Sequence, residues 1–418
     1  MVVTVSMVVS VRKAGLLMLD SLTPLHLAVA LDGAGWHPAA WRESDARPAE
    51  LFDAGYWADL VAEAERGSLD FVTIEDSLTV QSDDPVDPDD RIDRVRGRLD
   101  AVLIAARIAP RTQRIGLVPT AIVTHTEPFH LSKSIATLDY VSTGRAGVRV
   151  QISARHDATA HFGRRELPRL SLDSINTPAA QQQIGEYFAE AADYVEVLRR
   201  LWDSWEDDAE IRDVATGRFI DRHKLHYIDF EGRWFSVKGP SITPRPPQGQ
   251  PVVAALGHGG VSYELIAGSA DVGFVTPHDA AQASDIAGEI AALQWAAGRR
   301  RHTVRVFADL LVFLDRTESE AQTRRRRLDD LAGVEYRSDA EIFVGTPAQL
   351  ADVLQEWQAA GLSGFRLRPA TLPHDLVQIT EGLVPELRRR GLFRTAYEAD
   401  TLRGLLGLGR PANRYAIA

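Results

Sequence analysis

Apolar and polar positions along this chain change period in a recurring order. Residues 114–153 show the order best: an apolar run at 115–118 is followed by a loop, by apolar residues at helical spacing over 127–141, and by a second short run from 146. Recurrence every three to four residues predicts a helix, whereas a short apolar or alternating run predicts a strand. This stretch therefore predicts the strand–loop–helix–strand unit of a parallel sheet.

The last strand of this unit has one apolar and one polar face. Val148 and Val150 alternate with Arg149 and Gln151. Strands joined through helices are normally covered on both sides, so a polar inner row predicts a lined cavity rather than a solvent-exposed face.

Similar strand signals recur along the chain, with helical segments between nearly all of them. They begin near residues 26, 70, 114, 146, 251, 271, 304 and 364. Eight strands that alternate with helices indicate a single (β/α)8 TIM barrel over 26–418 rather than a doubly wound sheet. Three polar or turn-rich segments are predicted as insertions at the C-terminal mouth, at 77–97, 154–180 and 206–250. Residues 1–25 are predicted to be a disordered or non-native extension.

Composition narrows the chemistry. The 418 residues include no cysteine, which excludes disulfides, thiolate metal ligands and cysteine nucleophiles. The 47 basic and 58 acidic side chains give a net charge of -11, which argues against nucleic acid or an anionic membrane as a partner. No stretch approaches the roughly 20 apolar residues of a membrane span. We expect a cytoplasmic protein. We also expect no metal centre, since the histidines and acids are scattered along the chain.

Side chains that follow the strands are the candidates for chemistry, because barrel enzymes build their sites at the C-terminal ends of the strands. The first strand runs into a loop rich in glycine and tryptophan, which contains Trp36 and His37. The second strand ends at Asp76, the third at Thr120, and the fourth at Ser153. These groups are predicted to lie together at the mouth.

A glycine-rich turn follows the fifth strand. Gly257, His258 and Gly259 connect that strand to a predicted helix. Such a turn exposes backbone N–H groups at a helix N-terminus, where the partial positive charge suits a phosphate. The turn matches no Walker or dinucleotide fingerprint, so a simple tight turn is the alternative interpretation.

The order of the motifs resembles that of one enzyme family. The motifs are DGAGWHPAAWR, DLVAEAERGSLDFVTIED, TLDYVSTGR, LWDSW, VGTPAQLADVLQEW, VPELRRRGLFRTAYEADTLRGLLGL and RPANRY. Together they resemble the bacterial luciferase-like flavin-dependent monooxygenases, in particular the group that contains nitrilotriacetate, dibenzothiophene-sulfone and long-chain alkane monooxygenases. The resemblance covers about residues 26–415.

The resemblance implies a two-component monooxygenase that uses reduced FMN and O2 on a small organic substrate. It also implies a separate flavin reductase as a partner and favours a homodimer. By position, it implies that His37, Asp76 and His258 assist catalysis through hydrogen bonds. The cofactor contacts that it implies are Asp76, Thr120, Ser153, Gly257, His258 and Gly259.

Departures from the family pattern are concentrated at the cofactor site. The fourth strand reads RVQIS at 149–153, where the family has a sequence like NIVTS. His258 and Gly259 replace two phosphate-site serines, and Ile184 and Phe188 stand where the group offers histidine and tyrosine. Two alternatives therefore stay open: an F420-dependent oxidoreductase on the same barrel, and a cofactor-poor, non-catalytic paralogue that acts as a binding subunit.

Three arginines belong to the predicted inner row of the barrel. Arg149, Arg366 and Arg368 would point into the lumen if their strands alternate as predicted. Such a cluster would suit an anionic substrate or cofactor tail, and Trp36, Arg149 and Arg368 are the candidates for substrate contact. Pairing of the arginines with buried acids is the alternative.

Overall fold

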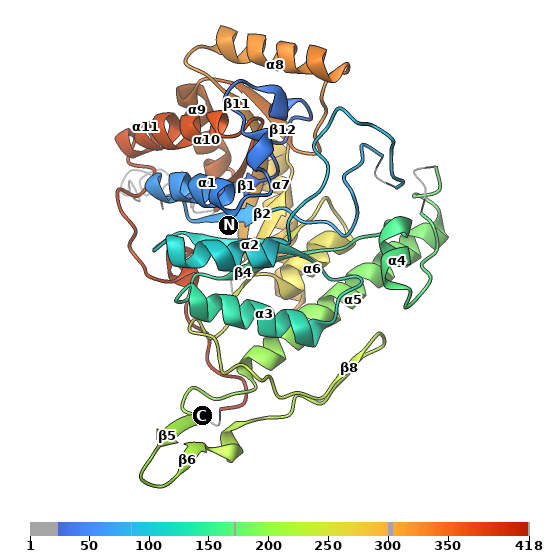
Figure 1. Ribbon diagram of the computed structural model, residues 1–418, viewed down its shortest axis with the longest axis vertical. Helices are drawn as coiled ribbons and strands as arrows, with labels where there is room; N and C mark the ends of the chain where they lie inside the picture. Colours follow the sequence, from blue (N-terminus) through green and yellow to red (C-terminus); the bar gives the residue numbers. More distant parts are fainter. Residues whose placement is uncertain (1–23, 85, 171–172, 300–303, 417–418) are drawn as a thin grey trace, which may run out of the picture.

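A closed parallel barrel lies at the centre of this computed structural model (Figure 1), which describes residues 24–84, 86–170, 173–299 and 304–416. Pairing of β1 with β13 and of β10 with β11 closes the ring. The predicted TIM barrel is confirmed, and each strand starts within two residues of its predicted position. The barrel strands are β1 (His26–Leu31), β2 (Phe71–Ile74), β3 (Gly116–Ile122), β4 (Gly147–Gln151), β9 (Val252–Leu256), β10 (Val272–Val275), β11 (Arg305–Leu314) and β13 (Gly364–Pro369).

A ring of helices covers the outside of the barrel, and each helix packs against the next. The ring closes where α10 and the π-helical turn η5 contact α1. Threonine caps followed by proline start α5 and α9, as is typical of helix N-termini. The helices are α1 (Ala54–Arg66), α2 (Ala101–Ile108), α3 (Pro128–Val141), α5 (Pro178–Asp203), α6 (Val261–Ser269), α7 (Ala280–Ala296), α9 (Pro347–Ala359), α10 (His374–Val377), η5 (Gln378–Leu383) and α11 (Val384–Arg389).

Apolar side chains fill the N-terminal end of the barrel. The short helix α12 (Leu402–Leu405) places Leu402 and Leu406 against the inward side chains of the strands. Gly116 at the start of β3 leaves room for this contact, because a Cβ there would lie 2.6 Å from Cδ1 of Leu402. The other members of this cluster include Ala28, Phe71, Val118, Phe274 and Phe307. This N-terminal end, which we call the floor of the barrel, is therefore filled with side chains. The cavities relevant to function lie toward the opposite end.

Two of the predicted insertions cover the mouth. The segment 77–97 has no helix or strand among its described residues, and its ends are joined by two hydrogen bonds between Gln81 and Gly97, of 2.8 and 3.0 Å. The segment 154–180 contains a helix that was not predicted, α4 (His156–Phe162). Both segments follow the C-terminal ends of strands, so they belong to the mouth.

The third insertion requires a correction. Segment 206–250 connects the end of α5 to the start of β9, which places the hairpin of β5 (Glu210–Asp213) and β6 (Arg218–Ile220) beyond the N-terminal end of the barrel. A helix that leads into a parallel strand ends at that side of a barrel. Only the tip of the second hairpin, β7 (Phe230–Glu231) and β8 (Ser236–Val237), runs back along α5 to the mouth side.

Further elements lie outside the eightfold pattern. A ninth strand, β12 (Glu341–Gly345), pairs with the second half of β11 and was not predicted. The helix α8 (Glu318–Ala332) precedes it and starts with a complete capping box.

Leu25 is buried and donates its N–H to Leu392 O at 2.8 Å. Residues 1–23 of the predicted extension lie outside the described residues. None of the described helices is long and apolar enough to cross a membrane.

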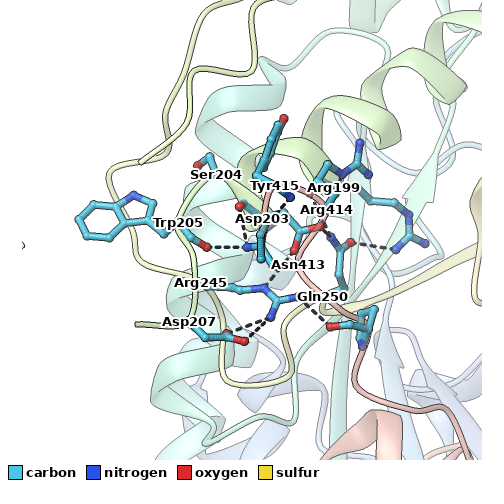
Figure 2. A network of polar contacts seen from close by, with 12 residues as sticks. Arg199, Asp203, Ser204, Trp205, Asp207, Arg245, Gln250, Asn413, Arg414 and Tyr415 are labelled. Atoms are coloured by element: carbon cyan, nitrogen blue, oxygen red, sulfur yellow. Dashed lines mark hydrogen bonds and ion pairs between the residues drawn. The ribbon is translucent and has the colours of Figure 1, made fainter. Parts of the chain in front are cut away.

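Figure 2 shows how the C-terminal tail is bound to the end of α5. The amide nitrogen of Asn413 donates to the carbonyl oxygens of Asp203 and Trp205, both at 2.8 Å. Its amide oxygen accepts from the N–H of Tyr415 at 2.8 Å. Arg245 donates to the Asp203 carboxylate at 3.0 Å. The motifs LWDSW and RPANRY therefore form one buried polar cluster.

Substitution Asn413→Ala is expected to lower the free energy of unfolding by about 1–3 kcal/mol, because it leaves one buried and one partly buried carbonyl group without their donor. Urea unfolding followed by circular dichroism measures this loss. The matched control is Glu398→Ala, on an exposed side chain nearby in the sequence, which should change stability by less than about 0.5 kcal/mol. Equal effects of both substitutions would contradict a stabilising role of the cluster.

Candidate active site

The strand register places opposite charges side by side inside the barrel. Asp309 of β11 lies in register with Arg366 of β13, and Arg368 follows on the same inner face one step nearer the mouth. Across the lumen, Thr120 of β3 lies in register with Arg149 of β4. The three arginines are only 0–5% exposed, so they lie inside the barrel.

Two buried carboxylates join these arginines into one chain of ion pairs. Asp309 Oδ1 accepts from Arg366 Nε at 2.8 Å, and its Oδ2 accepts from Arg368 Nε at 2.9 Å. Glu75 Oε2 accepts from Arg149 at 2.6 Å, while its Oε1 lies 3.4 Å from Arg366. The chain thus runs from β4 across the lumen to β13. We call these five residues the lumen network.

The electrostatics of the lumen network keep its acids ionised. Burial alone would raise the pKa of Asp309 and of Glu75, but the neighbouring guanidinium groups outweigh burial and hold both pKa values below their ordinary range. Pairing with buried acids, the alternative left open from the sequence, is what the structure shows. Arg149 Nε is buried and has no hydrogen-bond partner among the described residues.

The turn between β9 and α6 has the geometry of an anion site. Ser262 Oγ accepts from the N–H groups of His258 and Gly259, at 3.0 and 3.2 Å, and fixes the turn. Gly259 and Gly260 have φ values of 137° and 50°, which side chains rarely adopt, and nothing lies within 4 Å of a Cβ built on either. The outer face of the turn is therefore open at the N-terminus of α6. The side chain of His258 is 54% exposed, with Nδ1 3.0 Å from Thr276 Oγ1 and Nε2 3.7 Å from Asp339 Oδ2.

A cavity of about 280 Å³ lies beside this turn. Its walls are mostly apolar, and Arg149 and Gln151 supply polar groups. The cavity-lining residues are Arg149, Val150, Gln151, Ile152, Phe188, Leu256, His258 and Leu265. An open turn at a helix N-terminus next to a mostly apolar slot would suit a flat aromatic ligand that carries a phosphate.

A larger cavity of about 730 Å³ lies at the mouth, and we call it the mouth cavity. The segment 77–97 covers it as a lid. Trp41 Nε1 donates to Asp93 O at 3.1 Å, and Arg91 donates to Ala332 O at 3.3 Å, so the lid is attached on two sides. Side chains that line the mouth cavity include Trp36, His37, Gln81, Arg94, Arg98 and Tyr336.

His37 is held by the protein through both ring nitrogens. Its Nδ1 accepts from the N–H of Ala39 at 3.1 Å, which leaves Nε2 as the protonated nitrogen that donates to Asp329 at 3.1 Å. Burial lowers the pKa of His37, so the ring is neutral near pH 7. Both ring nitrogens of His37 therefore have partners within the protein, and its catalytic role stays a prediction.

The other predicted site residues do not all meet. Asp76 accepts from the N–H groups of Ser77 and Ala101, at 2.7 and 2.9 Å, and so holds the start of α2, while burial raises its pKa. Thr120 accepts from Arg149 at 2.8 Å and belongs to the lumen. Ser153 lies past the end of β4, where its N–H donates to Thr124. Trp36 lines the mouth cavity, with Arg368 stacked over its ring at 4.6 Å.

Four residues of the site were not identified from the sequence. Glu75 and Asp309 carried a usable signal, because each is an acid at an inward position of a predicted strand. Arg94 and Tyr336 lie in segments without periodicity, which gave no signal. Among the described parts of the chain, no group of three or more histidine, aspartate or glutamate side chains is placed to hold a metal ion.

Comparison with known proteins gives consistent matches. The family model of luciferase-like monooxygenases matches residues 35–341 of this chain. The N-acetyl-S-(2-succino)cysteine monooxygenase of Bacillus subtilis (strain 168) is 31% identical over 456 residues, covering 94% of this chain and 98% of the relative. Component A of the nitrilotriacetate monooxygenase of Aminobacter aminovorans is 29% identical, with the same coverage of 94% and 98%. The crystal structure of a long-chain alkane monooxygenase superposes with a TM-score of 0.80 at 24% identity, covering 92% of this chain and 96% of that chain.

Proposed function

This chain belongs to the luciferase-like monooxygenase family and is an oxidoreductase, and we propose that it is the FMN-dependent oxygenating component of a two-component system. A separate reductase would supply the reduced flavin, and the substrate would be a small organic molecule. When bound, the reduced flavin supplies the electrons that activate O2. The protein itself would bind and orient the flavin and the substrate, and it would exclude water from them.

The open turn between β9 and α6, beside the apolar slot, is the observation that carries this proposal. Since Ser262 accepts from the N–H groups of His258 and Gly259, the N–H groups at the start of α6 and the ring of His258 would hold the phosphate. Ile152, Phe188 and Leu256 would contact the ring system. Arg149 and Gln151, which line the slot, would lie at the polar edge of the ring system.

The mouth cavity would receive the substrate under the lid. Closure by segment 77–97 would exclude water from the reacting groups, which strengthens electrostatic interactions and limits side reactions. Asp76, which has a raised pKa, would act here by stabilising the start of α2 rather than by transferring a proton. The relatives do not select a substrate class, since their names range from nitrilotriacetate to a long-chain alkane.

Titration of the purified protein with FMN, reduced FMN and F420 tests the proposal. We expect saturable binding of FMN in at least one redox state, and a preference for FMN over riboflavin of roughly ten-fold or more, because the turn binds the phosphate. His258→Ala should reduce this preference about three- to ten-fold without weakening riboflavin binding. Fluorescence of the flavin follows each titration.

The matched control is His223→Ala, on an exposed histidine near the β5–β6 hairpin, which should leave the preference unchanged. Saturable binding of F420 without binding of FMN would favour the F420-dependent alternative. Absence of binding for all three cofactors would remove both enzymatic hypotheses.

A further inference from the structure

We infer that the mouth cavity takes a small organic carboxylate, which the guanidinium group of Arg94 binds. This inference rests on the proposed function in one respect, because it takes the mouth cavity as the substrate site. The arginines of the lumen network cannot serve this purpose, since buried acids already pair with them. The inference therefore concerns the lid and not the lumen.

Arg94 is a buried donor that the protein leaves incompletely satisfied. Its side chain is 10% exposed and lines the mouth cavity. One terminal nitrogen lies 2.8 Å from Asp83, while Nε is buried and has no hydrogen-bond partner in the described part of the chain. Among the described residues, Asp83 is the only acid within ion-pair distance of Arg94, so a carboxylate in the cavity would find a guanidinium group with a single, half-exposed counter-charge. Carboxylate oxygens suit a guanidinium best, because the two groups can form parallel hydrogen bonds.

Tyr336 offers a second donor on the same cavity. Its ring packs against His37 with centroids 5.2 Å apart, and its hydroxyl has no hydrogen-bond acceptor among the described residues. Burial raises the pKa of Tyr336 to about 12, so the hydroxyl keeps its proton at neutral pH and can donate. A guanidinium and a phenol on one cavity match the two oxygens of a carboxylate.

The charges around the mouth cavity leave room for one more anion. Arg98 is paired with Asp32 at 3.0 Å, and Glu335 is paired outward with Arg325 at 3.1 Å. Arg337 is exposed and has no ion pair among the described residues. Asp83 is therefore the one cavity-lining acid that pairs with Arg94, and it lies half exposed on the lid. A ligand carboxylate would compete with Asp83 for Arg94.

The remaining walls indicate an organic ligand rather than an inorganic ion. Trp36, Pro38, Val95 and Val334 give the mouth cavity an apolar side. A volume of about 730 Å³ lies within the range for ligands of ordinary metabolite size. A carboxylate group on a carbon skeleton meets both requirements.

Isothermal titration calorimetry on the full chain tests the inference without a flavin. The probes are glutarate and isophthalate, each compared with its uncharged diamide. We expect the wild type to prefer the carboxylates, and Arg94→Met to weaken their binding roughly ten- to a hundred-fold. Asp83→Asn should instead tighten carboxylate binding several-fold, because it removes the internal competitor. A purely structural role of Arg94 predicts no such gain.

The matched control is Arg114→Met, which removes the same charge from an exposed arginine at the floor of the barrel and should leave binding unchanged. The Asp83→Asn result keeps the test decisive if Arg94→Met fails to fold. Equal binding of carboxylates and diamides, or no saturable carboxylate binding, would overturn the inference.

The outcome is separable from that of the flavin titration. Flavin binding without carboxylate preference would leave the proposed function intact and remove the substrate class. Carboxylate binding that depends on Arg94, without binding of any flavin, would support the carboxylate site and remove the proposed cofactor.

Discussion

Asp309→Ala is expected to lower the free energy of unfolding by about 3–5 kcal/mol, the largest loss we expect for a single side chain in this molecule. Asp309 is fully buried between Arg366 and Arg368 and accepts hydrogen bonds from both. Its removal would leave two guanidinium groups inside the barrel with one fewer counter-charge. Breaking a buried ion pair in this way costs more than the pair contributes, because the remaining charge stays desolvated.

Guanidinium chloride unfolding measures this change. The control is Asp352→Ala, which removes the same charge from an exposed aspartate that pairs with Arg390 on the outer surface. An exposed ion pair contributes about 0–1 kcal/mol, so the control should remain close to the wild type. If Asp309→Ala were no more destabilising than the control, the lumen network would not stabilise the barrel.

Gly35→Ala is expected to cost about 2–5 kcal/mol of stability and to disturb the mouth cavity. Gly35 has a φ of 128°, and a Cβ there would lie 2.4 Å from Ala370 O and 2.6 Å from Thr371 Cα. Both obstacles are backbone atoms, which cannot rotate away. The N–H group of Trp36 donates to Pro369 O at the end of β13, at 3.0 Å, and that of His37 donates to Ala370 O, at 2.9 Å. Any shift of Gly35 therefore moves these two cavity-lining side chains.

Thermal unfolding and the carboxylate titration together check this prediction. Gly55→Ala is the control, because Gly55 lies in the first turn of α1 and a Cβ there meets nothing within 4 Å. Alanine is preferred to glycine in a helix, so this control should be neutral or stabilising by up to about 1 kcal/mol. A Gly35→Ala protein with wild-type stability and unchanged binding would show that the turn tolerates a side chain.

The barrel was predictable because its signals are local. The strands β3 and β4 and the helix between them can each be recognised within about ten residues, and the alternation around Arg149 correctly indicated a polar inner row. The elements that escaped prediction have weak periodicity. β12 is half buried along most of its length, and β5 contains Arg212 with a φ of 51°, which interrupts the alternation.

The site was less predictable because ring closure creates its contacts. Glu75 and Arg366 are 291 positions apart in the chain, and they meet since β1 pairs with both β2 and β13. Sequence periodicity placed Arg366 on the inner face but could not choose its partner. Arg94 lies on a lid without secondary structure, where no periodicity exists to place a side chain. Which arginine remains available for a ligand is therefore a property of the three-dimensional arrangement.

The helix α12 has a consequence for the order of synthesis. Leu402 and Leu406 complete the floor of the barrel, yet the ribosome adds them after all eight strands have been made. Until they arrive, a nascent chain with every strand in place still presents Phe71, Phe274 and Phe307 to water at the open floor. Docking of this short helix is thus the event that seals the core, and a delay in docking would prolong the period in which a chaperone can bind that surface.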